Sequence, residues 1–246
     1  MVLAKLAQQC ERLAVLQWTA RMGAVTAEAL ACRQGTSVAS ARSRLVAAER
    51  HGLVSRRRPL AGYPALYTIT RAGLRRSGLE GFAPCEVSAS NALHMIICVG
   101  VAVALEFGYP DHYAMGEREL RRAERERGGL LASARLRGVR PGVPPLHRPD
   151  LVLWSTNSVH ARPVAVEVEL TIKAPRRLEE ICRAWARASH VAGVLYIAPP
   201  SVEPALERAI GSVRAAERIV VAPLAALASA GEPSGISLAK AIPVEP

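Results

Sequence analysis

The sequence predicts an α+β protein in which an N-terminal helical domain precedes an α/β domain. Three helical segments and a basic hairpin fill residues 1–80, whereas strands and helices alternate in much of residues 92–246. Residues 81–91 contain Gly81 and Pro84 and have no apolar periodicity, so they are predicted to link the two domains.

Apolar spacing predicts three helices in the first domain. They lie at about residues 8–21, at 26–33, and from a cap at Thr36 or Ser37 to His51. The third helix carries one apolar stripe with spacings of three and four residues: Val38, Ala41, Leu45 and Ala48. Two short helices, a glycine turn and a longer helix form the order of a helix-turn-helix.

A basic hairpin and a short closing helix follow the third helix. Val54 and Tyr67–Ile69 have strand composition, a turn lies at Ala61–Pro64, and residues 71–77 are predicted to be helical. The stretch ARSRLVAAERHGLVSRRR…YTITRAG resembles the third helix and wing of winged-helix transcription regulators, and the resemblance covers about 70 residues. It implies a winged helix-turn-helix that binds double-stranded DNA.

The distribution of charge favours the same partner. Residues 1–80 hold thirteen Lys or Arg against four Glu, whereas residues 81–246 hold nineteen against seventeen acidic residues. A positive field confined to the first domain is typical of a surface that faces a polyanion, although a basic surface that only maintains solubility is the alternative. Phosphate contacts are predicted for Arg56, Arg57 and Arg58. Contacts to base edges are predicted for Ser40, Arg42, Ser43 and Arg44.

The second domain is predicted to begin with two helices, an apolar one at Asn91–Phe107 and a charged one at Glu117–Arg127. The Gly/Pro/Arg-rich stretch Gly128–His147 is predicted to be a mobile loop. From Arg148 the predicted order is strand Leu151–Trp154, strand Val164–Thr171, helix Pro175–Ser189, strand Val194–Ala198, helix Pro204–Glu217 and strand Arg218–Leu224.

Acidic side chains alternate along one of these strands. In VAVEVELTIK, residues 164–173, strand periodicity places Glu167, Glu169 and Lys173 on one face. Asp150 starts the preceding strand, and a turn near residues 159–160 would place it opposite Glu169. Like charges so close repel one another without a cation. Asp150, Glu167 and Glu169 are therefore predicted to converge on Mg²⁺, which prefers carboxylates and water.

The run Arg148-Pro149-Asp150, an acidic strand about 17 residues later and then a lysine resemble the PD-(D/E)xK nuclease core. The resemblance implies a restriction-endonuclease-like domain in which Mg²⁺ polarises the scissile phosphate and a lysine orients or activates water. The implied catalytic residues are Asp150, Glu167, Glu169 and Lys173.

A second resemblance covers most of the chain. The GERELRR and RPD…VEVELTIKAPRRLEEI stretches, behind a winged helix, are similar to the replication-relaxation family of plasmids and other mobile elements. In this resemblance Glu117 or Glu119 stands at an upstream acidic position, and His94 opens the second-domain helix. Each has an ordinary alternative, since Glu117 has an i,i+4 partner in Arg121 and an apolar helix often holds a core histidine.

The acidic strand departs from the nuclease pattern at the lysine. Glu169 stands two residues after Glu167, where the pattern has lysine, and Lys173 shares the face only if the strand runs past Thr171. Three functions therefore remain open: a DNA-binding accessory protein that has lost cleavage, an active Mg²⁺-dependent endonuclease, and a repressor with an α/β sensor or dimerisation domain. The acidic face could also be the solvated side of an edge strand.

Composition bears on where the protein acts. The five cysteines show no zinc-type spacing and are predicted to be reduced thiols of a cytoplasmic protein. The most apolar run, Met95–Leu105, has 11 residues, which is shorter than the roughly 20 that span a bilayer. We therefore predict a soluble protein without a membrane partner, and a homodimer is compatible with the sequence.

Overall fold

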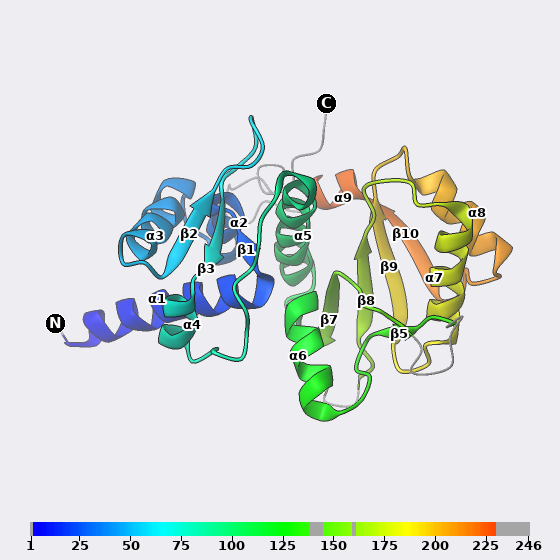
Figure 1. Ribbon diagram of the computed structural model, residues 1–246, viewed down its shortest axis with the longest axis horizontal. Helices are drawn as coiled ribbons and strands as arrows, with labels where there is room; N and C mark the ends of the chain where they lie inside the picture. Colours follow the sequence, from blue (N-terminus) through cyan, green and yellow to red (C-terminus); the bar gives the residue numbers. More distant parts are fainter. Residues whose placement is uncertain (1, 138–144, 159–160, 230–246) are drawn as a thin grey trace. The chain divides into compact units, whose positions relative to one another are not determined.

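The computed structural model describes residues 2–137, 145–158 and 161–229, with side chains from Gln9 onward (Figure 1). The chain is a mixed α+β protein of two compact units. The first unit holds the chain up to Phe107, and the second holds Gly108–Leu227. The predicted linker at residues 81–91 lies within the first unit by this division.

The first unit contains five helices and three short strands among its described residues. In chain order these are α1 (Val2–Met22), β1 (Ala24–Val25), α2 (Ala27–Gln34), α3 (Val38–Arg50), β2 (Val54–Arg57), β3 (Leu66–Ile69), α4 (Arg71–Ser77) and α5 (Ala89–Gly108). The strands form an antiparallel sheet in the order β1-β3-β2. The three predicted helices, the hairpin and the closing helix are confirmed, whereas β1 was missed because two residues carry no periodicity.

Side-chain caps fix where the helices of this unit begin. Thr26, Ser37 and Thr70 each accept a hydrogen bond through the hydroxyl from a backbone N–H three residues later, at 3.0–3.1 Å. Each cap supplies an acceptor to a donor that the first turn leaves unpaired. Ser37, rather than Thr36, is therefore the cap of α3.

The stripe on α3 faces the core of the first unit. Ala41 and Leu45 are fully buried, and Val38 and Ala48 are half-buried. Helix α3 packs on α2, while α1 contacts α4 and β3. The opposite side of α3 remains exposed at Arg42 and Ser43, so this helix presents a polar face outward.

Helix α5 is longer than the apolar run Met95–Leu105 within it. The 11 residues belong to a helix of 20, which by length and composition alone is able to cross a membrane. A buried core helix meets the same criterion, and 56% of its apolar stretch is buried.

The second unit is built on a five-stranded mixed sheet. Its described elements are β4 (His112–Gly116), α6 (Glu117–Arg127), β5 (Ala134–Arg135), β6 (Leu146–His147), β7 (Leu151–Ser155), β8 (Val164–Val168), α7 (Pro175–Arg187), β9 (Gly193–Ala198), α8 (Glu203–Ser212), β10 (Ile219–Pro223) and α9 (Leu224–Ser229), the last of which ends beyond the unit. The strand order is β10-β9-β8-β7-β4. Strands β4, β7 and β8 pair antiparallel, whereas β8, β9 and β10 are parallel.

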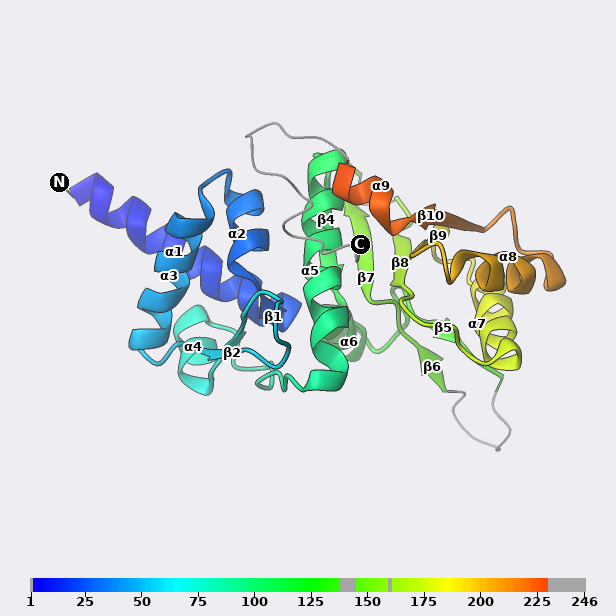
Figure 2. The same cartoon turned by 90° about the horizontal axis from the view of Figure 1, so that it is seen from above.

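Helices α7 and α8 cover one face of this sheet (Figure 2). Trp185, Ile181 and Leu206 from these helices meet Val194 and Tyr196 of β9 in one buried cluster. A parallel pair needs a crossover connection, and here a helix provides each one, as the alternation of strands and helices in the sequence predicted.

Several predictions about this unit need correction. Strand β4 was not predicted, and the helix predicted at Pro204–Glu217 ends at Ser212. Strand β8 ends at Val168, three residues before the predicted end, because the chain leaves the sheet ahead of Pro175. The stretch Gly128–His147 is not wholly a loop, since β5 and β6 form a short antiparallel ladder. Residues 138–144 of that stretch lie outside the described residues.

One glycine controls how closely α4 approaches the wing. A Cβ built on Gly73 would lie 2.1 Å from the backbone oxygen of Leu53 and 2.8 Å from Cδ1 of Ile69. The backbone oxygen cannot move aside without shifting the start of β2. Gly73→Ala should therefore lower the free energy of unfolding by about 1–3 kcal/mol, the usual cost of overpacking.

Thermal or denaturant unfolding of the full chain tests this expectation. Gly129→Ala is the matched control, because a Cβ there meets no atom within 4 Å. Equal stability of both variants and the parent protein would contradict the close packing of α4.

Candidate functional site

The wing arginines lie at an edge of the small sheet. Arg56 and Arg57 belong to β2, which pairs only with β3, and Arg58 follows directly. All three side chains are exposed. A hairpin edge with three adjacent guanidinium groups places positive charge where the grooves and backbone of an extended polyanion can reach it.

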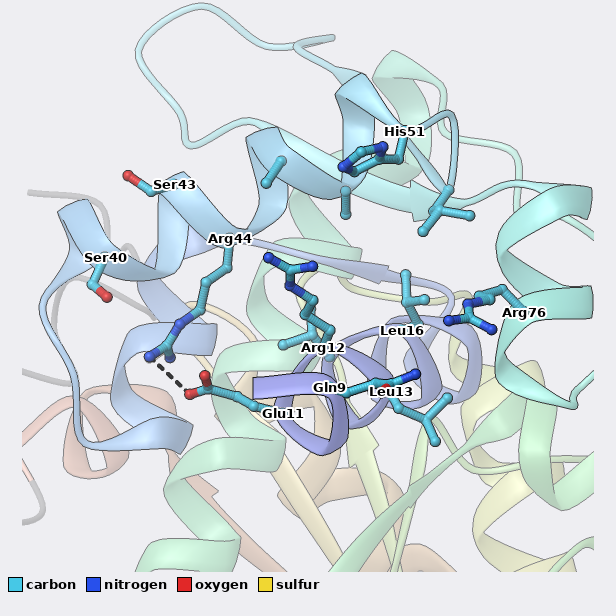
Figure 3. A pocket seen from close by; sticks show the side chains of 14 residues that line it. Gln9, Glu11, Arg12, Leu13, Leu16, Ser40, Ser43, Arg44, His51 and Arg76 are labelled. Atoms are coloured by element: carbon cyan, nitrogen blue, oxygen red, sulfur yellow. Dashed lines mark ion pairs between the residues drawn. The ribbon is translucent and has the colours of Figure 1, made fainter. Parts of the chain in front are cut away.

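The four residues predicted on the third helix do not act as one group. Arg42 pairs with Glu28 of α2 at 3.3 Å, on one side of α3. Arg44 pairs with Glu11 of α1 at 2.8 Å and donates to Gln34 Oε1 at 2.6 Å. Ser40, Ser43 and Arg44 instead line a groove between α3 and α1 (Figure 3).

The register of the β7–β8 ladder excludes the predicted pairing of Asp150 with Glu169. Leu151 pairs with Val166 and Val152 with Ala165, so continuing the register by one residue places Asp150 opposite Glu167. Residues directly opposed in an antiparallel pair share a face. The predicted pairing with Glu169 was wrong because the turn is centred nearer to Ser158 than to residues 159–160. The Asp150 carboxylate also accepts a hydrogen bond from Val168 N at 2.8 Å, which secures it at the end of β8.

Glu167 is a buried carboxylate with two donors on one oxygen. Its Oε1 accepts hydrogen bonds from His147 Nε2 at 2.6 Å and from Trp185 Nε1 at 3.0 Å. Burial raises the pKa of Glu167, the nearby His147 lowers it, and the charge of Asp150 raises it. The side chain therefore lies in a dry setting that favours its neutral form unless a cation is close.

The surroundings of Glu167 are aromatic and apolar. Trp185 and Tyr196 are almost wholly buried, and the imidazole of His147 lies edge-on to the Trp185 ring, with centroids 5.7 Å apart. Burial raises the pKa of Tyr196 well above its usual range and that of Cys182 to about 11. Both groups therefore stay protonated at neutral pH, so neither is a nucleophile here.

Lys173 reaches the acidic cluster by a route other than strand alternation. Strand β8 ends at Val168, although Glu169 N still donates to Ile197 O at 3.0 Å. The loop that follows turns back, so the Lys173 ammonium pairs with the buried Glu169 carboxylate. Burial lowers the pKa of Lys173, while the charges of Glu167 and Asp150 raise it.

The predicted convergence of three carboxylates on one point is not found among the described residues. Among the described residues, Asp150, Glu167 and Glu169 do not bring one oxygen each within 4.8 Å of the other two. Mg²⁺ usually keeps several waters and takes one or two carboxylates. Glu169 pairs with Lys173 instead.

A second buried carboxylate, that of Glu124, contacts the segments that precede β7. Glu124 of α6 accepts backbone hydrogen bonds from Leu131, Ala132 and Ser133 at 3.0–3.3 Å and one from Ser133 Oγ at 2.7 Å. Arg148 Nε lies 3.5 Å from the same carboxylate. Glu124 thereby ties α6 to the chain just ahead of Asp150. Glu117, by contrast, forms the i,i+4 pair with Arg121 that the sequence suggested, at 2.5 Å.

Sequence reasoning missed His147, Trp185 and Glu124. His147 was placed in a mobile loop, and Trp185 and Glu124 were counted as ordinary helix residues. The one available signal was position: His147 stands three residues before Asp150, directly ahead of the Arg-Pro-Asp run. His94, the other histidine considered, lies within α5 and has Cys98 Sγ 3.4 Å from its Nδ1.

The chain matches no family model, no curated protein and no solved structure.

The raised pKa of Glu167 predicts how stability changes with pH. Between the usual glutamate value of 4.5 and the raised folded-state value, the folded protein keeps a proton that the unfolded chain has released. Rising pH therefore lowers the free energy of unfolding in that interval. Glu167→Gln keeps an acceptor for His147 and Trp185 and removes the titration, so its stability relative to the parent should improve as pH rises above 4.5.

Melting temperatures measured from about pH 4 to 7 check this difference. Glu80→Gln, at an exposed position, should track the parent protein at every pH. If the difference in melting temperature between Glu167→Gln and the parent does not change with pH, Glu167 does not have a raised pKa in the folded protein.

Proposed function

We propose that this chain is a double-stranded DNA-binding protein of a plasmid or another mobile element, with a role in replication, relaxation or transcription. The first unit binds duplex DNA as a winged helix-turn-helix. The second unit is a restriction-endonuclease-like domain with a Mg²⁺ site at Asp150 and Glu167. The observation that carries the proposal is the exposed triple-arginine edge of β2, which directly follows the helix pair α2 and α3.

Element order and charge support the DNA-binding part. A helix, a short strand, two further helices and a two-stranded hairpin follow one another in the first unit, in the order that the winged-helix resemblance implies. The polar side of α3 supplies Ser43 and Arg42, both exposed, for contact with base edges. The wing arginines supply phosphate contacts, which fix register and orientation on the duplex.

Replacing Arg56, Arg57 and Arg58 together with alanine should weaken binding to any duplex sequence. Removing one phosphate contact reduces the slope of log affinity against log salt by about 0.9, so the slope should fall by up to about 3. A mobility-shift titration at several salt concentrations measures both quantities.

A triple variant of Arg125, Arg127 and Arg208 is the charge-matched control. These arginines are exposed in the second unit and should leave the salt slope unchanged. The wing assignment fails if both triple variants lower affinity equally, or if neither does.

The acidic site supports the second part of the proposal. Asp150 directly precedes β7, Glu167 lies on the neighbouring strand β8, and the charge of Asp150 acts on Glu167. A Mg²⁺ ion bound there would supply charge neutralisation at a phosphate and a bound water of lowered pKa. His147 and Trp185 hold one oxygen of Glu167 and so fix the direction of the carboxylate.

Mg²⁺ should raise the melting temperature of the full chain, because a ligand that binds the folded state stabilises it. Asp150→Asn and Glu167→Gln should each abolish this shift, whereas Glu169→Gln should keep it, since Glu169 pairs with Lys173. A shift that survives in Asp150→Asn and Glu167→Gln would place the ion elsewhere. Loss of the shift in Glu169→Gln alone would reverse the assignment of the two glutamates.

An active Mg²⁺-dependent endonuclease is the second candidate, favoured by the position of Lys173 beside the carboxylates. The pairing of this lysine with Glu169 argues for weak cleavage or none. Incubation of supercoiled plasmid with the protein and Mg²⁺ or EDTA separates the two candidates. Strong nicking that Asp150→Ala and Glu167→Ala both abolish, with duplex binding retained, would promote the enzyme over the accessory protein. Nicking that both variants keep would come from another site.

A further inference from the structure

A groove in the first unit has no part in the proposed contacts of the wing. It lies between α1, α3 and α4, has a volume of about 980 Å³, and is shown in Figure 3. Pockets for small molecules have volumes of about 300–1,000 Å³, so the groove is large enough for one such ligand.

The floor of the groove is apolar. Leu16 of α1 is buried and points into it, Leu53 is half-buried at the start of the wing, and Leu13 is 39% exposed at its edge. An exposed leucine beside a groove leaves apolar surface in contact with water. Covering that surface with an aliphatic or aromatic ligand would be favourable, because it removes apolar area from water.

The rim of the groove is basic. Arg12, Arg44 and Arg76 come from three different helices, and His51 stands at the end of α3. Glu11 is the one acidic residue of the lining, and it pairs with Arg44. Among the described residues, Arg12 and Arg76 form no ion pair, and both side chains are exposed. Guanidinium groups bind carboxylates and similar anions through charge-assisted hydrogen bonds.

We propose that this groove binds a small amphipathic carboxylate, with its apolar body on the leucine floor and its anionic group between Arg12 and Arg76. A free phosphate would use the rim and not the floor, and a neutral lipid would use the floor and not the rim. The combination of the two selects a ligand that has both parts.

The same groove offers a means of control over DNA binding. Ser40, Ser43 and Arg44 line it, and they belong to the helix expected to face the bases. A ligand in the groove would occupy these side chains and lower affinity for duplex. This consequence rests on the proposed function, whereas binding of the carboxylate does not.

The first test uses the full chain and anilinonaphthalene sulfonate, a fluorescent apolar anion. Its fluorescence should rise and saturate at one equivalent per chain, and laurate should displace it, whereas inorganic phosphate and dodecanol should not. Arg12→Gln and Arg76→Gln should each weaken laurate competition about tenfold, the effect of removing one charge-assisted hydrogen bond. Arg75→Gln, on the same helix as Arg76 and outside the groove, is the matched control and should change nothing.

Several outcomes would overturn the proposal. Displacement by phosphate or by dodecanol as effective as that by laurate would show that only the rim or only the floor is used. No saturable binding, or laurate competition unchanged in the Arg12→Gln/Arg76→Gln double variant, would exclude the site. Ala47→Trp fills the groove and should abolish binding in a chain whose circular dichroism matches the parent. A dimer in light scattering that Ala47→Trp dissociates would assign the groove to a second copy instead.

The second test measures duplex affinity with and without laurate. Laurate should weaken binding of the parent protein about tenfold or more and leave the Arg12→Gln/Arg76→Gln variant unaffected. If laurate binds in the first test but the chain has no affinity for DNA, the proposed function fails and the ligand site stands. If the chain binds DNA and laurate binds without changing that affinity, the coupling is wrong.

Discussion

The carboxylate of Glu167 imposes the strongest constraint on the second unit. Burying a carboxyl group is costly unless hydrogen bonds or opposite charge compensate, and here the side chain is 6% exposed. Its neighbours supply that compensation: Trp185 donates from α7, His147 donates from β6, and Lys173 adds positive charge. Three separate segments are therefore positioned by one side chain. An apolar residue at 167 would leave the Trp185 indole N–H and the His147 imidazole without this partner.

Sequence periodicity located the secondary structure well where elements are long and amphipathic. The stripe on α3 and the bounds of α4 and α6 follow directly from spacing and caps. Sequence periodicity failed for very short elements, whose strand structure depends on pairing with a distant segment. Strand β1 has two residues, and the ladder between β5 and β6 has two on each strand, so neither leaves a pattern to detect. Such elements exist because a neighbouring strand completes their backbone hydrogen bonds.

In the candidate site, too, the sequence predicted the residue types but not the contacts that depend on tertiary pairing. The residue types of the acidic cluster were evident from VEVE and the preceding Asp150, but their partners depend on register. A shift of two residues in the hairpin exchanges Glu169 for Glu167 opposite Asp150 without altering which face they share, so alternation alone could not decide it. His147 could not be assigned for another reason: its pairing with Glu167 requires a ladder that joins residues 134–135 to 146–147 across a Gly/Pro/Arg-rich stretch.

The ammonium of Lys173 bears on whether the proposed site could cleave DNA. In the nuclease pattern the lysine follows the acidic residue on the strand, so backbone geometry holds it in place. Here it arrives from a loop and pairs with Glu169, which stands where that lysine would be. Compared with the nuclease pattern, a carboxylate stands where the lysine would be, and the lysine lies in the loop that follows and pairs with that carboxylate. The ammonium of Lys173 is paired with Glu169, and a lysine neutralised by a carboxylate is a poor group for activating water. The positive charge of Lys173 stabilises buried carboxylates. Any catalytic use of this ammonium would have to break its ion pair with Glu169.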